Sequence, residues 1–334
     1  MKTVILHSIF LLFSAITLAQ DPQFSQVFAV PLYLGPSFAG ATGGTRVATN
    51  FRDQWPALKN EFISYSLAFD YFFKNTNSGI GLAVIQDHSG AGLLSSTNCL
   101  LQYSYVFNLT KDLQLRPGIE ASYNVHSLSY NKVVFGDQLS FDGTLPSSTV
   151  ETSLAKKISY IDFASSILLF HSKYWLGISA HHLSKPNQSL TNEKSVIPLK
   201  ITFYGGKKIK LNTAMAKRQK ENLYLAFEYK QQAKFSQCLF GSYVDYIDMT
   251  FGIWYRGLPK HTYQSYFNSD AIVLAIAYRF SQFKIGYSYD ITTSRLAINS
   301  AGSHEISIVY LTAPRSKPKF KMIPCPTEQL DIYK

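Results

Sequence analysis

The sequence predicts an all-β fold, a transmembrane antiparallel β-barrel of about 14 strands (about 12–14) in a bacterial outer membrane. Three observations support this fold class. The N-terminus has the features of a secretory leader, the composition is rich in aromatic residues and poor in charge, and apolar and polar side chains alternate with a period of two along most of the chain. Such strands suit one lipid-facing side and one wetter side.

The first 19 residues are predicted to be a signal peptide. Lys2 supplies a positive start, an apolar stretch runs to Leu18, and the small side chain of Ala19 precedes a cleavage site before Gln20. A retained membrane helix is the alternative interpretation. The apolar stretch is short for a bilayer and a polar segment follows it at once, which favours cleavage.

The composition favours barrel strands over membrane helices. The chain has 22 Tyr and 24 Phe among 334 residues, yet only 16% of its residues are charged. Mean hydropathy is −0.02, and no apolar run of helix-spanning length follows the leader. A net charge of +11 commonly indicates a protein that binds nucleic acid, but an exported barrel does not meet nucleic acid. Outer-membrane lipid phosphates or acidic proteins are the expected partners, with no nucleic acid.

Period-two alternation divides the mature chain into fourteen segments, most of them long enough to cross a bilayer as tilted strands. An even count is what single-chain bacterial barrels require. The segments are 42–51, 60–73, 78–86, 94–108, 112–130, 158–171, 173–184, 196–209, 221–232, 235–245, 248–257, 270–280, 282–291 and 303–312.

Short and long connections alternate between these segments, as periplasmic turns and outer loops do. The predicted short turns are 74–77, 109–111, 171–172 and 281, and the predicted long loops are 131–157, 185–195, 257–269 and 292–302. The connections 210–220 and 232–235 depart from the pattern. Because the strand count is even, we expect both the N- and the C-terminus in the periplasm.

The predicted lumen face carries charges of both signs, which would be very costly against lipid. Mixed signs predict a cross-braced, partly filled interior. These residues are Asp70, Arg116, Glu120, Glu228, Lys230, Arg256, Arg279, Lys284, Asp290 and Glu305.

The predicted domains are the leader 1–19, a barrel with its N-terminal segment over 20–312, and a basic, Pro-rich tail over 313–334. Proline spacing in the tail prevents regular strand pairing. Two interpretations of the tail remain open, a solvated end and a docking strap for a periplasmic partner.

Catalytic motifs do not emerge from the sequence, so we predict a protein that is not an enzyme and has no cofactor or metal. Three widely spaced cysteines suggest neither a zinc site nor a disulfide framework. The pair His181–His182 resembles a site, but adjacent strand residues face opposite ways, so only one could enter the lumen. The corner 52–56, with Trp55 before Pro56, fits either an interfacial aromatic position or a brace or partner contact.

Several ordered motifs stand along essentially the whole mature chain. They are the mature start 20–26, the segments 31–34, 36–40, 52–56, 160–163, 175–177, 181–188, 252–256 and 285–290, and the closing segment 302–307. With these motifs the chain resembles the PorP/SprF family. One departure is Pro36–Ser37–Phe38, where many members have Asn-Pro-Ala-Phe, and it leaves the subgroup undetermined.

The resemblance implies a non-enzymatic outer-membrane component of the type IX secretion and gliding machinery. Its implied partners are ring or lipoprotein components and secreted adhesins or their C-terminal domains. A barrel that transports a hydrophobic or small solute is the alternative. The N-terminal motif is too polar for packing against lipid, so we expect it to fold into the barrel mouth near Arg52 and Trp55. Candidate structural or partner-binding residues are Gln23, Phe24, Gln26, Arg52, Gln54, Trp55, Trp254, Arg256, His304 and Glu305.

Overall fold

The computed structural model describes residues 21–26, 29–58, 62–90, 94–129, 157–190, 194–211, 221–263, 266–293 and 300–312. The predicted leader 1–19 and the predicted tail 313–334 lie outside these ranges, so both stay predictions. No helix among the described residues is long and apolar enough to cross a membrane.

Two short helices precede a long series of strands. The helices are α2 (Pro31–Leu34) and the 3-10 turn η1 (Pro36–Phe38). The strands are β1 (Thr45–Gln54), β2 (Phe62–Phe73), β3 (Ser78–Ser89), β4 (Leu94–Tyr105), β5 (Phe107–Asn108), β6 (Leu113–Leu128), β7 (Lys157–His171), β8 (Tyr174–His181), β9 (Lys200–Lys210), β10 (Asn222–Gln232), β11 (Phe235–Tyr246), β12 (Met249–Tyr263), β13 (Tyr266–Phe280), β14 (Phe283–Thr292) and β15 (Ser303–Leu311).

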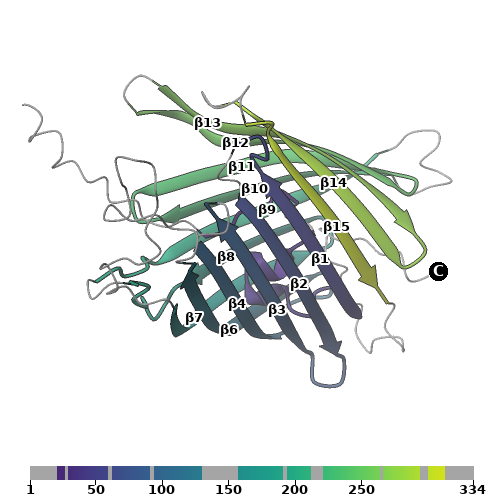
Figure 1. The fold of residues 1–334 in the computed structure, drawn as a ribbon. Coiled ribbons are helices and arrows are strands. Elements are labelled where there is room, and N and C mark those ends of the chain that lie inside the picture. The colour runs from purple at the N-terminus through teal and green to yellow at the C-terminus, as the bar shows by residue number, and fades with distance from the viewer. Residues whose placement is uncertain are drawn as a thin grey trace, which may run out of the picture.

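These strands form a closed antiparallel barrel of 14 strands, as predicted. The short β5 continues β4 past a break at Val106, because both pair with β6. With β4 and β5 counted as one strand, every strand pairs with its neighbour in sequence, and β1 closes the barrel against β15. Figure 1 shows the strands as one tilted wall whose last strands return beside the first.

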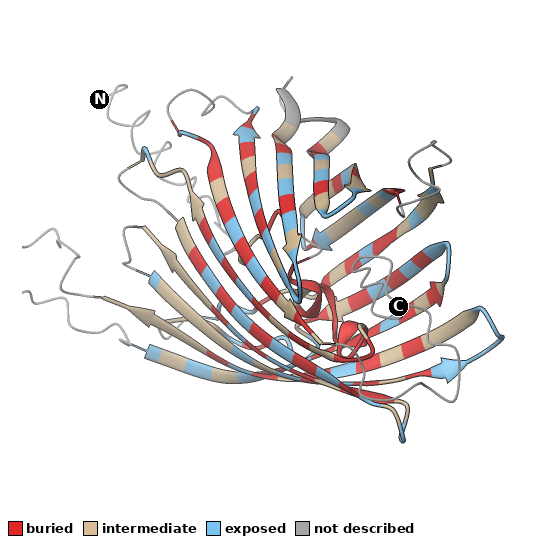
Figure 2. Ribbon diagram, turned by 90° about the vertical axis from the view of Figure 1, so that its right-hand side faces the viewer, coloured by how far each residue is buried: buried red, intermediate tan, exposed pale blue. Residues whose placement is uncertain are grey.

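Side chains alternate between the lipid face and the lumen along each strand. On β2, Leu67 is 56% exposed on the outside, whereas Ala68 and Asp70 are buried inside. The red and blue bands along the strands in Figure 2 follow this alternation around the wall. The period of two read from the sequence therefore has its physical origin in the pleat.

The N-terminal segment fills part of the lumen. Residues 21–26 and 29–41, here called the plug segment, run inside the wall, where α2 and η1 lie buried (Figure 2). Their approach to the wall is close. A Cβ added at Gly118 would lie 2.4 Å from the backbone nitrogen of Ser37, and one at Gly79 would lie 2.1 Å from the carbonyl oxygen of Ala39. Glycine at these two wall positions therefore allows backbone-to-backbone packing.

One predicted loop is wrong. Residues 257–269 were expected to form an outer loop, but β12 continues to Tyr263 and β13 starts at Tyr266. The register shifts between Arg256 and Gly257 and again between Leu258 and Thr262. The pairing of β12 with β13 therefore continues, with irregularities, through residues predicted to form a loop.

The two ends of the described chain do not lie together. The even strand count does place Thr45 beside the end of β15, because Arg46 pairs with Leu311. However, Asp21 lies at the opposite end of the barrel, where it contacts Lys200 at the start of β9. The expectation of two ends on one side fails for residue 21, because the plug segment runs along the lumen before β1 begins.

Candidate functional site

The plug segment is held to the wall by three polar clusters, which together form the candidate site. The first, here called the Glu305 cluster, comprises Ser25, Gln26, Arg52, Arg256, Asp290 and Glu305. Glu305 on β15 accepts hydrogen bonds from the backbone nitrogens of Ser25 (2.6 Å) and Gln26 (3.2 Å). A wall carboxylate thus satisfies backbone donors of the plug segment that would otherwise be buried without partners.

Two arginines complete this cluster around one serine. Arg52 on β1 and Arg256 on β12 each lie 2.8 Å from Asp290 on β14, and Arg52 also lies 3.4 Å from Glu305. Both guanidinium groups donate to the Ser25 hydroxyl oxygen, at 2.7 and 2.9 Å, and that hydroxyl donates to Asp290 at 2.7 Å. The Ser25 hydroxyl uses its one donor and both acceptor positions.

Gln26 fastens the same stretch of the plug segment to the last strand, β15. Its side-chain amide donates to the Glu305 carbonyl oxygen (2.9 Å) and accepts from the Ser307 hydroxyl (2.5 Å). The side chain is fully buried. An amide in this position needs both partners, because a buried amide without hydrogen bonds is strongly unfavourable.

A second cluster, here called the Asp70 cluster, holds the other end of the plug segment. Asp70 on β2 is fully buried, pairs with Arg46 at 2.5 Å and accepts the backbone N–H of Gly40 at 2.9 Å. Arg116 on β6 donates to the Gly40 carbonyl oxygen at 3.1 Å. Both backbone groups of Gly40 are therefore held by charged wall side chains. The prediction of a cross-braced interior is confirmed by these ion pairs.

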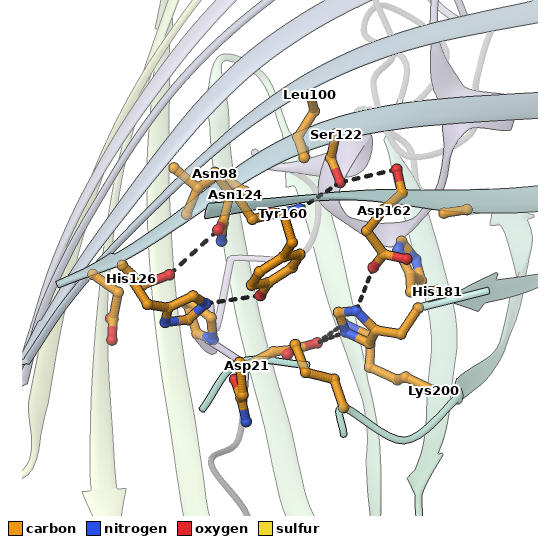
Figure 3. Close-up of a pocket in the computed structure, with 18 of the residues that line it drawn as sticks. Asp21, Asn98, Leu100, Ser122, Asn124, His126, Tyr160, Asp162, His181 and Lys200 are labelled. Carbon is orange, nitrogen blue, oxygen red and sulfur yellow. Dashed lines mark hydrogen bonds and ion pairs between the residues drawn. The ribbon is translucent and has the colours of Figure 1, made fainter. Parts of the chain in front are cut away.

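A cavity of about 530 Å³ opens at the end of the lumen where β7 begins and β8 ends. Figure 3 shows Asp21, His126, Tyr160, Asp162 and Lys200 around it. The third cluster, here called the Asp21 cluster, lies on its wall and comprises Asp21, Asp162, His182 and Lys200. Asp21 pairs with Lys200, and its carboxylate lies 3.1 Å from His182. His182 in turn lies 2.7 Å from Asp162 on β7.

The ionisation of this cluster follows from its geometry. Burial alone would lower the pKa of His182, but the Asp21 carboxylate and the hydrogen bonds with Asp162 and Asp21 raise that pKa to about 9. Burial also opposes ionisation of Asp21, yet Lys200 and His182 hold the pKa of its carboxyl well below its usual value. His182 and Asp21 are therefore both charged at neutral pH.

The prediction that only one histidine of the pair 181–182 enters the lumen is wrong. Both His181 and His182 line the cavity. Strand β8 ends at His181, and His182 adopts a left-handed backbone with φ of 62°. Strand alternation no longer applies beyond the strand end, so the second ring turns inward too. Among the described residues, no group of three or more His, Cys, Asp or Glu side chains is arranged to hold a metal ion.

The structure brings some of the predicted residues together and separates the others. Gln26, Arg52, Arg256 and Glu305 form the Glu305 cluster, and Gln54 accepts a bond from Arg52 at 3.4 Å. The rest lie outside the cluster. Phe24 packs against Tyr33, Gln23 bonds to Gln237, Trp55 packs on Phe62, Trp254 stacks near Tyr243 inside the lumen, and His304 bonds to Tyr287 on the outer face.

Sequence reasoning did not select Ser25, Asp21, Asp162, His182 or Lys200 as site residues. Ser25 and Asp21 stand in the polar mature start, whose unsuitability for lipid was the available signal. For His182 the signal is its place beside His181, but strand alternation predicts that only one of the two side chains enters the lumen. Lys200 begins a strand and shows no sequence feature that distinguishes it from the other lysines.

Comparison with known proteins identifies the family. The family model for the type IX secretion system membrane protein PorP/SprF matches residues 16–310. The chain belongs to the PorP/SprF family. The resemblance predicted from the motifs is confirmed, and it assigns this outer-membrane barrel a role related to type IX secretion. A search of curated proteins finds no match.

Solved structures with a similar fold are outer-membrane barrels. The Ralstonia pickettii toluene transporter TbuX has a TM-score of 0.48 at 9% identity, covering 84% of this chain and 92% of that chain. A Pseudomonas aeruginosa FadL homologue has a TM-score of 0.46 at 10% identity, covering 87% and 98%. The P. putida toluene transporter TodX has a TM-score of 0.46 at 9% identity, covering 85% and 92%. These likenesses concern the fold alone.

Replacement of Arg52 is expected to destabilise the barrel more than replacement of Arg256. Arg52→Met leaves Glu305 without its ion-pair partner and is expected to lower the free energy of unfolding by about 3–5 kcal/mol. Arg256→Met should cost less, because Asp290 keeps Arg52 and Asp270 is 35% exposed. Urea unfolding in detergent micelles measures both. An equal or smaller loss for Arg52→Met would contradict this ranking.

The attachment of Asp21 is expected to weaken at alkaline pH. A raised His182 pKa contributes stability fully below about pH 6.5, and this contribution is lost as the pH rises through about 9. The lowered pKa of Asp21 contributes stability that is fully present above the usual carboxyl pKa. This stability is lost as the pH falls through the lowered pKa. The attachment is therefore strongest between these limits.

Hydrogen exchange of residues 21–26, corrected for its intrinsic pH dependence, measures this attachment. Protection should fall by at least about tenfold between pH 7 and pH 10, since more than one pKa unit is involved. His182→Gln is the control and should remove most of that fall. A pH dependence that persists unchanged in His182→Gln would show that another group is responsible.

Proposed function

We propose that this protein is a non-enzymatic component that assists the export or surface attachment of cargo proteins, such as adhesins. It would do so by binding a cargo C-terminal domain or a ring or lipoprotein component. The observation that carries the proposal is the plugged lumen. The N-terminal plug segment is fastened there by the Glu305, Asp70 and Asp21 clusters, which leaves the rim for recognition.

The barrel is wide enough to hold an open channel if the plug segment were absent. An 8-stranded barrel is about filled by its own side chains, whereas barrels of about 16–18 strands leave an aqueous channel. A barrel of 14 strands lies near the open end of this range. Here Leu32 and Phe38 of the plug segment belong to one buried hydrophobic cluster with wall residues that include Tyr204 and Tyr224. This cluster occupies the interior. A filled interior supports a binding role over a conducting one.

We infer that the short-turn end, where Thr45 and Leu311 lie, faces the periplasm. In that orientation the cavity faces the cell exterior, and the basic segment after Leu311 begins in the periplasm, where ring components would be reached. Of the candidate residues, Trp55 and His304 are best placed to contact a partner. Gln26, Arg52, Arg256 and Glu305 are buried, so their proposed role is to hold the plug.

Affinity capture tests the binding role. The tagged chain, solubilised from native membranes in detergent, is expected to recover a secreted surface protein or a ring component. A tagged outer-membrane barrel of another family from the same cells is the control. Recovery of a bound lipid with no protein partner would instead favour solute transport.

Conductance in planar bilayers separates binding from transport. The intact protein is expected to show no large steady channel, because the plug segment and its ion pairs occupy the lumen. A variant lacking residues 21–41, with its fold checked by heat-modifiable gel migration, should show a markedly larger conductance. A large steady conductance of the intact protein would contradict the proposed closed lumen.

A further inference from the structure

Strand β7 is longer than the ladder that covers one of its edges. On one side it pairs with β6 along its whole length, as far as Lys157 opposite Ser127. On the other side the ladder with β8 starts only at Ser165. Residues 157–164 therefore extend beyond the part of β8 that pairs with β7. This stretch lies at the cavity end of the barrel, because Tyr160 and Asp162 line the cavity.

The chain leaves the edge of β7 abruptly. The Leu183 backbone nitrogen makes a last bond of 3.0 Å to the Phe163 carbonyl oxygen. His182 and Lys185 both take left-handed backbone angles, with φ of 62° and 47°. Beyond them the chain pairs with itself, through Asn187 and Val196, and not with β7.

Asp162 fixes this departure point. Its carboxylate accepts the Ser184 hydroxyl at 2.6 Å and the Phe163 backbone nitrogen at 2.8 Å. It also accepts the bond from His182, whose ring reaches Asp21 of the plug segment. Asp162 therefore fixes the departing chain beside Ile161 and Asp162, and among the described residues it leaves the edge at Lys157 and Ser159 uncovered.

The uncovered backbone groups belong to every second residue. Because the Phe163 carbonyl points to the β8 side, strand alternation directs the backbone groups of Lys157, Ser159 and Ile161 to the same side. The Ile161 carbonyl oxygen accepts the Ser184 hydroxyl at 3.3 Å. For the other edge groups of these three residues, the described part of the chain provides no hydrogen-bond partner.

An edge of this kind is a template for another strand. Exposed rows of backbone donors and acceptors pair readily with extended chains. Backbone donors and acceptors cannot face lipid without hydrogen-bond partners. On this stretch the side chains do face outward, since Ile161 and Phe163 are 61% and 50% exposed on the outer face. An added strand would satisfy these groups and continue the wall of the barrel.

The charge of the cavity indicates which side chain such a strand would carry. Four carboxylates line it, those of Asp21, Asp87, Glu120 and Asp162, against three cations, Lys194, Lys200 and the protonated His182. Asp21 and Asp162 have cationic partners. Glu120 receives a bond from the Gln102 amide at 2.6 Å, and Asp87 receives one from the Ser64 hydroxyl. Neither of these two carboxylates has a cation within ion-pair distance among the described residues.

We propose that the β7 edge at Lys157, Ser159 and Ile161 is a strand-addition site for an extended segment of a secreted cargo polypeptide. Alternate side chains of the added strand face the lumen, and a basic one enters the cavity toward Glu120. This assignment rests on the cargo-binding function proposed above and specifies where and how the cargo binds.

Photo-crosslinking in native cells tests this site. A photoreactive amino acid at Ile161 is expected to give an adduct with the cargo protein recovered by affinity capture, and one at Leu67 on the lipid face should not. Ser159→Pro removes an edge N–H but none of the bonds to β6 and should lower the adduct by about tenfold. Ser159→Ala keeps the N–H and should leave it unchanged. Glu120→Gln should lower the adduct as well.

The crosslinking results can refute strand addition and the basic side chain separately. Equal adducts for Ser159→Pro and Ser159→Ala, an adduct with residues 130–156 of the same chain, or no adduct would refute strand addition. An adduct insensitive to Glu120→Gln would refute the basic side chain. Affinity capture in the same strains keeps the two proposals apart. Cargo recovered equally with Ser159→Pro refutes only the edge site, whereas no cargo recovered with the unaltered chain refutes the proposed function.

Discussion

Buried charges in the lumen impose the main constraint on this barrel. An ion pair removed from water loses solvation that its mutual attraction offsets only if the remaining hydrogen-bonding positions are also filled. In the Glu305 cluster the plug segment helps to fill them. Ser25 bonds to both arginines and Asp290, and the backbone nitrogens of Ser25 and Gln26 bond to Glu305. The wall needs the plug segment as much as the plug segment needs the wall.

The same dependence connects the ends of the lumen. Glycines in the wall allow η1 and Ala39 to approach the strand backbones closely, and the Asp70 cluster holds Gly40. At the cavity, the Asp21 cluster joins the start of the plug segment to His182, just after the end of β8, and to Asp162 on β7. The plug segment is therefore tied to the wall at both ends of the lumen.

Much of the wall could be predicted from the sequence, because a strand with one lipid face leaves a local signal. The alternation around Leu67 and Asp70 is one example, and the predicted number of strands is confirmed. Local patterns were insufficient where the backbone departs from a regular strand. His182 is left-handed, and irregular pairing lets β12 pass Gly257. Neither feature follows from residue types alone.

The plug contacts were harder to predict. Ser25 and Glu305 are 280 positions apart, and no spacing rule links them. The polar motif at the mature start suggested that this segment enters the barrel mouth, but not that it runs along the lumen to Gly40. Only closure of the barrel brings its partners on β1, β12, β14 and β15 around Ser25.

The position of the Glu305 cluster has a consequence for the closed wall. Arg52 and Glu305 stand opposite each other on β1 and β15, the first and last strands, so the cluster lies across the seam where the cylinder is completed. Ser25 and Gln26 bond to groups on both sides of this seam or next to it. Withdrawal of Ser25 and Gln26 would therefore remove hydrogen-bond partners from both sides of the seam at once. The β1–β15 ladder itself would stay paired, so the plug segment acts on the closed wall as a clamp across its last joint.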